Sequence, residues 1–309
     1  MPEKYQHAVV IGAGAYGSAM AHILSSCAHH VTLLTSDESV ASNICVEHRN
    51  PRLQFEHCFH ENVCGSVDDM CLSSCDVIVY ASRSSDFAQC YAKVRSISSV
   101  PLIATCKGIH DGGKLCSDIA AEIDHVDDRF LYLAGPSFAA DIMRDCPIKL
   151  EIGCVDALRS SDYAARLSCS TCSVIPYHFT KSIEVAAALK NVLAIVCGMH
   201  AHRGDSFVAV TFSDGMKALA DILVQFGSNM DYILRYSCLG DVVLTCMNTQ
   251  SRNARFGRAI VQSLEWGGEL VEGAYTAQHV QQFLSRYGLV SDFFEKYCSM
   301  ITEYTAQLI

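Results

Sequence analysis

The sequence lacks an excess of positive charge. Lys and Arg number 23 against 33 Asp and Glu, which gives a formal net charge of −10 at pH 7. Nucleic acids and anionic membrane surfaces are bound through clustered cations that neutralise phosphates. The composition therefore disfavours nonspecific binding to nucleic acid or to a membrane surface. It leaves room for a local basic pocket that holds one phosphate.

The sequence also lacks a long uninterrupted apolar segment. The run from Ala186 to Met199 contains a lysine and is shorter than the ~20 residues that a membrane-spanning helix needs. A second apolar stretch lies near the N-terminus, but only Lys4 precedes it and three glycines interrupt it, so it does not have the pattern of an export signal. We therefore expect a soluble, cytoplasmic protein without stable membrane insertion.

Cysteine is abundant, but no framework of paired spacings is visible. The 17 cysteines are scattered, and an odd number without an export signal predicts reduced thiols in a cytosol. Cys169 and Cys172 have the spacing of half a zinc site or of a redox pair. No second CxxC follows, so we predict no metal site. Many of these cysteines should be small core residues.

The first half of the chain alternates between strand and helix patterns. A β-rich run at His7–Gly12, a helix from Tyr16 to about Cys27 and a strand at Val31–Leu34 form a β-turn-α-β unit. Further strands are expected at Asp76–Ala81, Pro101–Thr105, Phe130–Ala134 and Ile148–Gly153, and helices near Asp86–Ile97 and Lys114–Ile123. This alternation predicts an α/β domain with a Rossmann-like, doubly wound sheet.

The pattern changes near residue 180, after which strand patterns disappear. Long segments with apolar residues at i, i+3 and i+4 spacing predict helices at Ile183–His200, Phe207–Phe226, Asn253–Trp266 and Ala277–Tyr287. We therefore expect a dinucleotide-binding domain at residues 1–180 and an all-α substrate-binding and catalytic domain at 181–309. No internal repeat or low-complexity segment is evident.

The strongest local motif is Gly12-Ala-Gly14-Ala-Tyr-Gly17, which matches GxGxxG. Gly12 permits the tight turn, Gly14 lets a pyrophosphate approach the backbone, and Gly17 lets helix and strand pack closely. The helix that follows presents free N–H groups to the phosphates. Because the motif lies between a predicted strand and a predicted helix, it indicates a dinucleotide site rather than an ordinary glycine-rich turn.

The choice between NAD and NADP depends on the end of the second strand. An acid there binds the adenosine ribose hydroxyls in NAD enzymes. Leu34 is followed by Thr35, Ser36 and Asp37, and Asp37 either contacts the ribose or caps the next helix. No arginine lies nearby in the sequence to pair with a 2′-phosphate. These residues favour NAD slightly and leave both cofactors open.

Lys190 lies in an otherwise apolar helix. Burial would lower its pKa and suit it to general acid–base chemistry near neutral pH, although a lysine in a core helix can also extend its ammonium to solvent. Asp241 and Thr245 are four residues apart, so they share one face of a helix that we expect to run through Gly240–Asn253. The acid can orient the lysine or bind a substrate hydroxyl.

Candidate anion contacts lie in two further segments. Arg252 and Asn253 follow Ser251, and arginine suits a phosphate because its planar fork donates in parallel; the alternative is a solvated helix start with Ser251 as N-cap. Pro136 and Ser137 follow Gly135, and we predict that they start a helix whose N–H groups hold an anion or a hydroxyl.

Lys107 follows the strand at Pro101–Thr105. Ligands bind at the carboxyl ends of the strands in open α/β sheets, so this lysine is expected near the cofactor. A second lysine close to Lys190 would lower the pKa of Lys190 further through like-charge repulsion.

These segments together resemble one family. The chain resembles the bacterial form of the NAD(P)-dependent glycerol-3-phosphate dehydrogenases along nearly its whole length. The matching segments stand in family order: IGAGAYG at Ile11–Gly17, CKGI at Cys106–Ile109, AGPSFA at Ala134–Ala139, ALKN at Ala188–Asn191, GDVVLTCMNTQSRNARFG at Gly240–Gly257 and VEGAYTA at Val271–Ala277.

The resemblance implies a role for each matching position. Lys190 corresponds to the proton donor and acceptor, with Lys107 and Asp241 beside it as catalytic residues. The implied substrate contacts are Lys107, Gly135, Ser137, Lys190, Asn191, Asp241, Thr245, Ser251, Arg252 and Asn253. The implied cofactor contacts are Gly12, Gly14, Ala15, Tyr16, Gly17, Ser36, Lys107, Ala139, Arg252, Leu270 and Glu272. No metal is implied.

The sequence departs from the family pattern without losing a proposed catalytic group. Ala15-Tyr16 replaces a Ser-Trp pair, Ser36 stands where Arg or His is frequent, and Asp214 and Tyr275 replace arginines. The resemblance further implies a homodimer, a small-molecule substrate, and a role in supplying glycerol 3-phosphate for phospholipid synthesis.

Two other functions are considered. A two-domain hydroxyacid dehydrogenase of the 6-phosphogluconate or ketopantoate type also pairs a dinucleotide domain with a helical domain that carries a lysine, but the long SRN-containing segment argues against it. A catalytically inactive nucleotide-binding sensor would keep the glycine turn without needing Lys107, Lys190 and Asp241 together.

Overall fold

A computed structural model describes residues 3–124, 129–248, 251–262, 264 and 266–307. The chain forms two compact units. Unit 1 comprises residues 1–106 and 117–180, and unit 2 comprises residues 107–116 and 181–309. The short segment 107–116 thus belongs to the second unit although it lies within the first half of the sequence.

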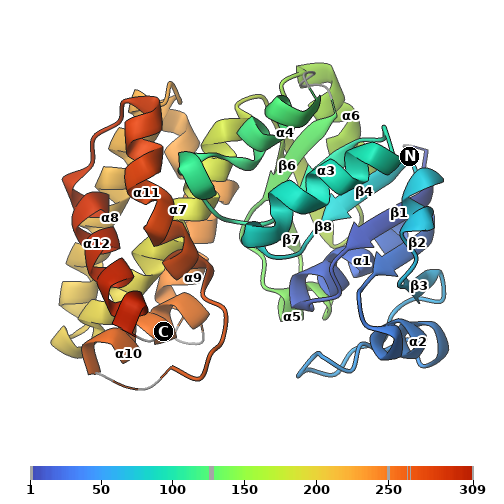
Figure 1. Cartoon of the computed structure of the whole chain (residues 1–309), viewed down its shortest axis with the longest axis horizontal. Coiled ribbons are helices and arrows are strands. Elements are labelled where there is room, and N and C mark those ends of the chain that lie inside the picture. Colours follow the sequence, from blue (N-terminus) through green and yellow to red (C-terminus); the bar gives the residue numbers. More distant parts are fainter. Residues whose placement is uncertain (1–2, 125–128, 249–250, 263, 265, 308–309) are drawn as a thin grey trace. The chain divides into compact units, whose positions relative to one another are not determined.

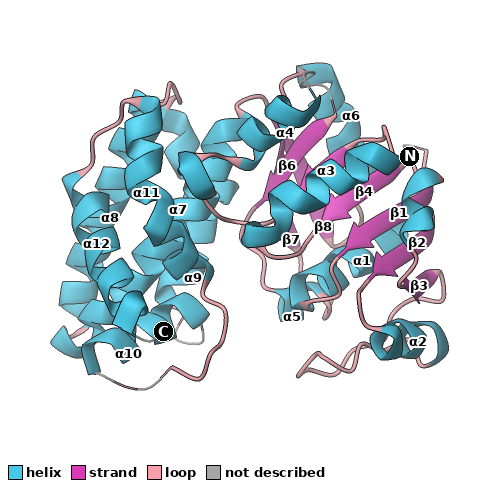
Figure 2. Ribbon diagram, viewed as in Figure 1, coloured by secondary structure: helices cyan, strands magenta, loops and turns pink. Residues whose placement is uncertain are grey.

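Unit 1 is built on one sheet of eight strands in the order β3-β2-β1-β4-β5-β6-β7-β8. The strands are β1 (Tyr5–Ile11), β2 (Ala28–Leu34), β3 (Val63–Ser66), β4 (Val77–Tyr80), β5 (Leu102–Ala104), β6 (Phe130–Ala134), β7 (Ile148–Gly153) and β8 (Cys172–Tyr177). All neighbouring pairs are parallel except β6 and β7. The strands, magenta in Figure 2, confirm a doubly wound, Rossmann-like sheet.

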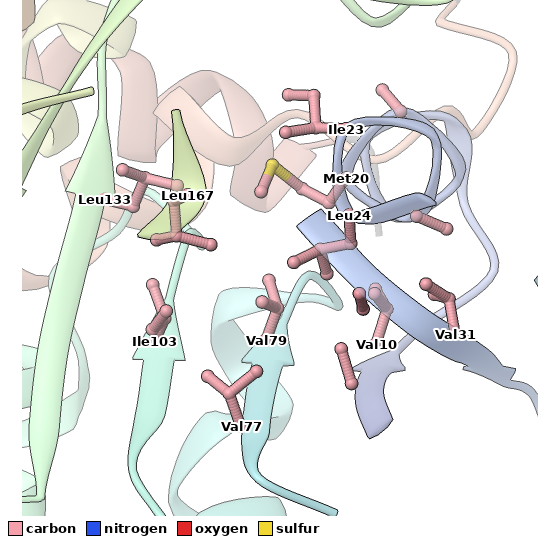
Figure 3. Close-up of a cluster of buried hydrophobic side chains, with 14 of the residues drawn as sticks. Val10, Met20, Ile23, Leu24, Val31, Val77, Val79, Ile103, Leu133 and Leu167 are labelled. Carbon is pink, nitrogen blue, oxygen red and sulfur yellow. The ribbon is translucent and has the colours of Figure 1, made fainter. Parts of the chain in front are cut away.

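Helix α1 (Ala15–Cys27) covers one face of this sheet. Its Met20 and Leu24 are fully buried, and Figure 3 shows them above Val10 of β1 and Val79 of β4. Helices cover both faces of the sheet, so side chains on either side of a strand are buried. This explains why the strands read as continuous apolar runs in the sequence.

The opposite face of the sheet is covered by α3 (Phe87–Ile97). Side chains alternate along a strand, so Tyr80 points away from the face that Val79 occupies. The Tyr80 ring meets Phe87 of α3 edge-on, with 5.2 Å between ring centroids, and both residues are buried. The remaining helices of unit 1 are α2 (Glu38–Val46), α4 (Cys116–Asp124), α5 (Ala139–Ile142) and α6 (Ala157–Leu167).

Unit 2 consists of helices. They are α7 (Thr180–His200), α8 (Asp205–Gln225), α9 (Asp241–Met247), α10 (Arg252–Gln262), α11 (Glu272–Tyr287) and α12 (Asp292–Gln307), and α11 and α12 lie side by side in Figure 1. Short 3₁₀ or π turns occur along the chain at Asp69–Ser73, Ser84–Asp86, Asp111–Gly113, Ala201–Arg203, Met230–Leu234 and Tyr236–Gly240.

Helix α7 is the core of unit 2. It is apolar on all sides, and every residue from Ile183 to Met199 is buried. The apolar run seen in the sequence is too short to span a membrane, but the helix that contains it, with the turn that follows, has 24 residues and is long and apolar enough by composition. Its most apolar window is 100% buried within the protein, as in the core helix of a globular domain.

Three glycines let the neighbouring helices touch the backbone of α7. A Cβ atom at Gly198 would stand 2.1 Å from the carbonyl oxygen of Ala254, and one at Gly257 would stand 2.0 Å from that of Ile195. Gly273 at the start of α11 approaches the carbonyl of Asn191 in the same way. No side chain fits at these three crossings, so the sequence there is fixed by helix packing.

Several elements differ from the sequence expectations. The segment Gly240–Asn253 is not one helix: α9 ends at Met247 and α10 begins at Arg252. Residues 249–250 lie outside the described part of the chain. The elements β3, β8, α2, α6 and α12 were not predicted from the sequence.

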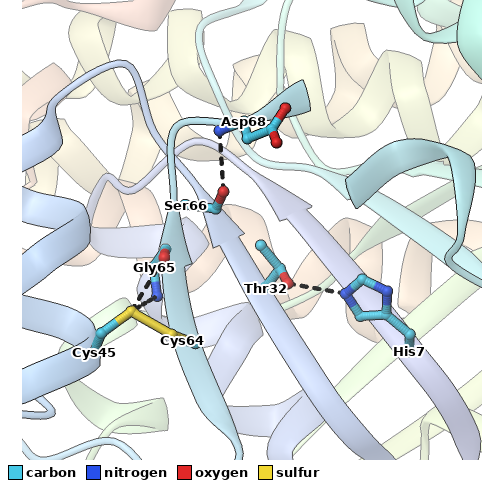
Figure 4. The surroundings of a disulfide bond; sticks show 7 residues. All are labelled: His7, Thr32, Cys45, Cys64, Gly65, Ser66 and Asp68. Carbon is cyan, nitrogen blue, oxygen red and sulfur yellow. Dashed lines mark hydrogen bonds between the residues drawn. A yellow bond between two sulfur atoms is a disulfide. The ribbon is translucent and has the colours of Figure 1, made fainter. Parts of the chain in front are cut away.

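The expectation of reduced cysteines is wrong for one pair. Cys45 of α2 and Cys64 of β3 form a disulfide, with 4.7 Å between their Cα atoms. Figure 4 shows the bond beside Gly65, whose N–H points at the Cys45 sulfur from 3.2 Å. Scattered cysteines do not predict pairing in space, and here the packing of α2 against β3 brings two of them together. The other 15 cysteines are not in disulfide bonds.

Candidate active site

Lys190 lies on α7 with its side chain buried. The residue is 4% exposed, and Leu189 and Val192 beside it are fully buried. Its ammonium donates hydrogen bonds to Asp241 Oδ1 at 2.5 Å and to Thr245 Oγ1 at 2.9 Å. An ammonium carries three N–H donors, so one N–H is left without a partner among the described residues. Lys190 therefore does not extend to solvent, and it keeps one proton available to a ligand.

Asp241 lies between two lysines. Its Oδ2 accepts a hydrogen bond from Lys107 Nζ at 2.9 Å, while its Oδ1 is bound to Lys190. Asp241 is 1% exposed, so this carboxylate has almost no contact with water. Lys107 is part of the segment 107–116, which places it in unit 2 with the other two residues. The cluster thus gathers one acid and two amines from three distant parts of the chain.

The local backbone explains the geometry of Asp241 and Thr245. Asp241 is the first residue of α9, directly after the π turn at Tyr236–Gly240. One turn later, the Thr245 hydroxyl donates to the carbonyl oxygen of Asp241 at 2.7 Å. Since this uses the hydroxyl proton, the oxygen of Thr245 is left to accept from Lys190.

The electrostatics set the protonation of the pair. Burial lowers the pKa of Lys190 from 10.5 to about 7, with Asp241 raising the pKa and Lys107 lowering it. Burial on its own would raise the pKa of Asp241, but the positive charges of Lys107 and Lys190 outweigh it and hold this pKa below 3.8. At neutral pH the acid is therefore ionised and Lys190 exchanges its proton readily.

A chain of side-chain amides lies next to the lysine. Asn191 Nδ2 donates to the Lys107 carbonyl at 3.4 Å, and Asn191 Oδ1 accepts from Asn253 Nδ2 at 3.0 Å. Asn253 Oδ1 in turn accepts from the Gly273 N–H at 3.0 Å. These bonds fix α7, α10 and α11 relative to one another. The sequence pointed to Asn253 as a candidate anion contact and to Asn191 only through the resemblance. The part played by Gly273 was missed because a backbone N–H leaves no sequence pattern.

The proposed phosphate residues lie at the start of α10. Ser251 is buried and directly precedes the helix, while Arg252 is exposed, and no described acidic side chain forms an ion pair with Arg252. The neighbouring Arg255 is different, because it pairs with Glu269 at 2.9 Å. Arg252 therefore remains available for an anion.

The remaining predicted positions of unit 2 lie beside α11. Leu270 is in the preceding loop and is 43% exposed. Glu272 is the first residue of α11. The contacts of both residues with a cofactor stay predictions.

The glycine turn in unit 1 has the shape that a dinucleotide needs. Gly12 has φ of +109°, and a Cβ there would lie 2.9 Å from the Ala81 carbonyl oxygen. A Cβ at Gly17 would lie 1.8 Å from the Gly12 carbonyl oxygen, so only glycine lets α1 pack on the turn. At Gly14, by contrast, the space is open. Gly14 is also the N-cap of α1 and has no side chain to satisfy the free N–H groups, which leaves them for phosphates. Ala15 and Tyr16 are the first two residues of α1.

At the end of β2, Asp37 is the N-cap of α2, and Ser36 is exposed just before it. Hydrogen bonds from the Ser39 hydroxyl, the Val40 N–H and Arg52 lower the pKa of Asp37 to about 2. Arg52 Nη2 lies 2.7 Å from Asp37 Oδ2. The sequence shows no arginine close to Asp37, but the loop after α2 folds back and brings Arg52 next to it.

The segment Gly135–Phe138 does not start a helix, which contradicts the prediction. The helix, α5, begins only at Ala139 and has four residues. Gly135 lies against β7, where a Cβ would stand 2.6 Å from the Lys149 carbonyl oxygen, so only glycine fits at this position. Ser137 is instead held by its neighbours: its hydroxyl donates to the Gly135 carbonyl at 3.1 Å and accepts from Tyr16 Oη at 3.1 Å.

Metal ligands do not cluster in the part of the chain that the structure describes, where no group of three or more His, Cys, Asp or Glu side chains could hold an ion. Cys169 and Cys172 are both free thiols.

Known protein families match both halves of the chain. Residues 7–159 match the family described as NAD-dependent glycerol-3-phosphate dehydrogenase N-terminus, and residues 180–306 match the family described as NAD-dependent glycerol-3-phosphate dehydrogenase C-terminus. A glycerol-3-phosphate dehydrogenase [NAD(P)+] from Sinorhizobium fredii is 34% identical over 280 residues, covering 87% of this chain and 83% of the relative. One from Agrobacterium fabrum is 34% identical over 291 residues, covering 87% and 84%.

Solved structures show the same fold. The glycerol-3-phosphate dehydrogenase from Coxiella burnetii superposes with a TM-score of 0.89 at 22% identity, covering 98% of this chain and 96% of that one. A probable 2-dehydropantoate 2-reductase from Bacillus subtilis reaches a TM-score of 0.60 at 12% identity, covering 96% and 99%. The ketopantoate type considered above thus shares the architecture at a lower similarity.

Proposed function

The chain belongs to the NAD-dependent glycerol-3-phosphate dehydrogenase family, and on that premise we propose that it interconverts sn-glycerol 3-phosphate and dihydroxyacetone phosphate, with Lys190 as the general acid and base. The reaction is sn-glycerol 3-phosphate plus NAD(P)⁺ to dihydroxyacetone phosphate plus NAD(P)H and a proton. The observation that carries the proposal is the buried Lys190 ammonium, which is held by Asp241 and Thr245 with one N–H left for a substrate oxygen.

The proton moves at Nζ of Lys190. In the reducing direction the ammonium gives its proton to the oxygen that becomes the substrate hydroxyl. In the oxidising direction the neutral amine takes that proton back. A pKa of about 7 supports both roles, since a group that titrates near the working pH is a good donor and a good acceptor.

Asp241 and Lys107 support this step. The carboxylate fixes the direction of the Lys190 ammonium, because a hydrogen bond to each of two acceptors leaves one orientation for the third N–H. Lys107, bound to the other oxygen of Asp241, keeps the acid ionised and adds positive charge where the alkoxide develops.

The substrate phosphate is assigned to the start of α10. Arg252 presents a planar set of donors, and Ser251 and Asn253 on either side add a hydroxyl and an amide. Anchoring the phosphate away from the reacting carbon lets its binding energy orient the substrate. Gly135 and Ser137 of unit 1 are proposed as further substrate contacts, and Asn191 as a contact beside the lysine.

The dinucleotide is assigned to unit 1, where the open space at Gly14 and the free N–H groups of α1 fit a pyrophosphate. When bound, the nicotinamide supplies or accepts the hydride. The residues proposed to hold the cofactor are Gly12, Gly14, Ala15, Tyr16, Gly17, Ser36, Lys107, Ala139, Arg252, Leu270 and Glu272. We further propose that residues 1–180 form the dinucleotide domain and residues 181–309 the helical domain that carries the substrate.

The cellular assignments rest on the resemblance to the bacterial enzymes. We propose a cytoplasmic homodimer without membrane insertion that supplies glycerol 3-phosphate for phospholipid synthesis. The full burial of the apolar window of α7 supports the absence of membrane insertion. Sedimentation of the purified chain measures the oligomeric state.

The reaction is tested with the purified chain by following oxidation of NADH and of NADPH with dihydroxyacetone phosphate. Dihydroxyacetone, which lacks the phosphate, and ketopantoate serve as controls. We expect turnover with the phosphorylated ketone and little with either control. Turnover of ketopantoate alone, or binding of the dinucleotide without turnover of any of the three, would overturn the proposal.

A further inference from the structure

The choice between NAD and NADP depends on whether the Asp37 carboxylate is available to the adenosine ribose. An acid that selects NAD must accept hydrogen bonds from the ribose hydroxyls. In this protein Asp37 Oδ1 accepts from the N–H groups of Ser39 at 2.9 Å and of Val40 at 3.2 Å. Its Oδ2 accepts from Arg52 at 2.7 Å. Both oxygens are engaged in holding α2 and Arg52, so Asp37 is poorly placed to serve as a ribose acceptor.

The loop that carries Arg52 is tied to the glycine turn. Asn50 is 1% exposed, and its Nδ2 donates to the Ala13 carbonyl at 3.0 Å and to the Ser18 hydroxyl at 2.9 Å. Its Oδ1 accepts from the backbone N–H of Arg52 at 3.0 Å. Asn50 therefore fixes the backbone of Arg52 relative to the turn that receives the pyrophosphate.

We propose that Arg52 selects NADP(H) by binding the 2′-phosphate of its adenosine ribose, with Asp37 holding the guanidinium and Asn50 positioning the loop. The guanidinium has five N–H donors, of which the hydrogen bond to Asp37 uses one, and the Arg52 side chain is 51% exposed at the surface. A planar guanidinium suits a phosphate better than any other side chain. Ser36, exposed one residue before Asp37, adds a hydroxyl at the same place.

This inference rests on the proposed dehydrogenase function and goes beyond it by choosing the cofactor. It replaces the slight preference for NAD that Asp37 suggests in the sequence. The negative charge of Asp37 opposes a phosphate that approaches Arg52, and only the cation of Arg52 makes the position favourable for a 2′-phosphate. Neutralising Asp37 should therefore increase the affinity for NADPH. If Asp37 instead held the ribose, the same change would decrease the affinity for NADH.

The first experiment measures kcat/KM for NADPH and NADH in the wild-type chain and in Arg52→Gln. We expect the wild type to prefer NADPH, and Arg52→Gln to lose about 10- to 150-fold with NADPH, the range for one charge-assisted hydrogen bond, while NADH changes less than about threefold. Arg49→Gln is the matched control, because Arg49 is an exposed arginine three residues earlier in the same loop. Equal losses with both cofactors in Arg52→Gln, or the selective loss in Arg49→Gln instead, would overturn the inference.

A second measurement does not need turnover. Isothermal titration of adenosine 2′,5′-bisphosphate and of adenosine 5′-monophosphate compares binding with and without the 2′-phosphate. Arg52→Gln should weaken only the bisphosphate, and Asp37→Asn, which keeps a side-chain oxygen for the helix cap, should tighten it. If the wild type binds both ligands equally, Arg52 is not a selectivity residue even in an active enzyme. If the bisphosphate preference is present and dihydroxyacetone phosphate is not reduced, the proposed reaction fails and this inference stands.

Discussion

Replacing Lys190 tests the proton step directly. Lys190→Met keeps the length of an unbranched side chain and removes the amine from a site that is 4% exposed, so the buried volume is nearly unchanged. The substitution also leaves Asp241 with Lys107 as a partner at 2.9 Å, which keeps a cation beside the carboxylate. The variant should therefore fold and still bind its ligands.

The loss of rate in Lys190→Met depends on whether another side chain can donate the proton. In this variant Asp241 keeps Lys107 as a cationic partner, which favours the ionised carboxylate, so Asp241 has no proton to give. Removing a positioned acid typically costs about 10² to 10⁴ in rate, or about 2.7 to 5.4 kcal/mol in the barrier. We expect the lower end of that range if Lys107 substitutes for the lost amine, and Lys107→Met combined with Lys190→Met then reaches the upper end.

The pH dependence identifies the group. Lys190 is mostly the ammonium below its pKa of about 7 and mostly the amine above it. Reduction needs the ammonium, so kcat/KM for dihydroxyacetone phosphate should fall as the pH rises above about 7. Oxidation needs the amine, so kcat/KM for glycerol 3-phosphate should rise up to about 7 and then level off. Lys190→Met should lose both slopes.

The assay is steady-state kinetics in both directions over a range of pH, with Lys217→Met as the control, since Lys217 is an exposed lysine of α8. Wild-type turnover in Lys190→Met would refute the assignment of Lys190 as the acid. Unchanged pH slopes in a slow Lys190→Met variant would assign the titration to another group.

Four further results are expected. Asp241→Asn should lower the free energy of unfolding by about 1–3 kcal/mol near pH 7, measured by urea denaturation, because it removes the charged acceptor that both Lys107 and Lys190 bind; an unchanged free energy of unfolding would contradict this. Arg252→Ala should raise KM for dihydroxyacetone phosphate far more than KM for NADPH or NADH, and an unchanged KM would remove its anchoring role. Gly257→Ala should destabilise by about 1–3 kcal/mol through overpacking, whereas Gly267→Ala, where the space is open, should not; equal effects would refute the packing argument. Cys45→Ser should lower stability by about 3 kcal/mol under non-reducing conditions, since the disulfide joins residues 19 apart, and equal thermal unfolding with and without dithiothreitol would argue against that bond.

The sequence was informative where a pattern is local. The glycine turn lies between β1 and α1 as expected, because the spacing of Gly12, Gly14 and Gly17 is set by one turn of backbone and needs no knowledge of distant residues. Six of the eight strands of unit 1 were predicted from apolar runs for a related reason, since burial on both faces of the sheet removes polar residues from such strands.

The sequence was less informative where the chain folds back on itself. Lys107 was expected at the carboxyl end of a strand, and the structure adds that its segment belongs to unit 2 and reaches Asp241, 134 residues away. The same limit hid Arg52, which returns to Asp37 through a loop, and the disulfide between Cys45 and Cys64. Such contacts depend on tertiary packing, and spacing in the sequence does not encode them.

Two local predictions were wrong. Pro136 and Ser137 have the composition of a helix start, yet the backbone is extended at Phe138 and α5 begins only at Ala139. The segment from Gly240 to Asn253 has helical spacing throughout, yet it divides into α9 and α10, and this break puts Arg252 and Asn253 at a helix start. Both segments were predicted to bind an anion, so the position of the helix start changes which N–H groups and side chains could contact it.

The glycines at positions 198, 257 and 273 also bear on how mutational screens of this protein should be read. A saturation library scored only for growth or turnover would rank these three positions with Lys190, because any replacement would force the surrounding helices apart and spoil the site indirectly. Measuring protein abundance alongside activity separates the two kinds of intolerance: variants at the glycines should lose soluble protein, whereas Lys190→Met should accumulate normally and turn over slowly.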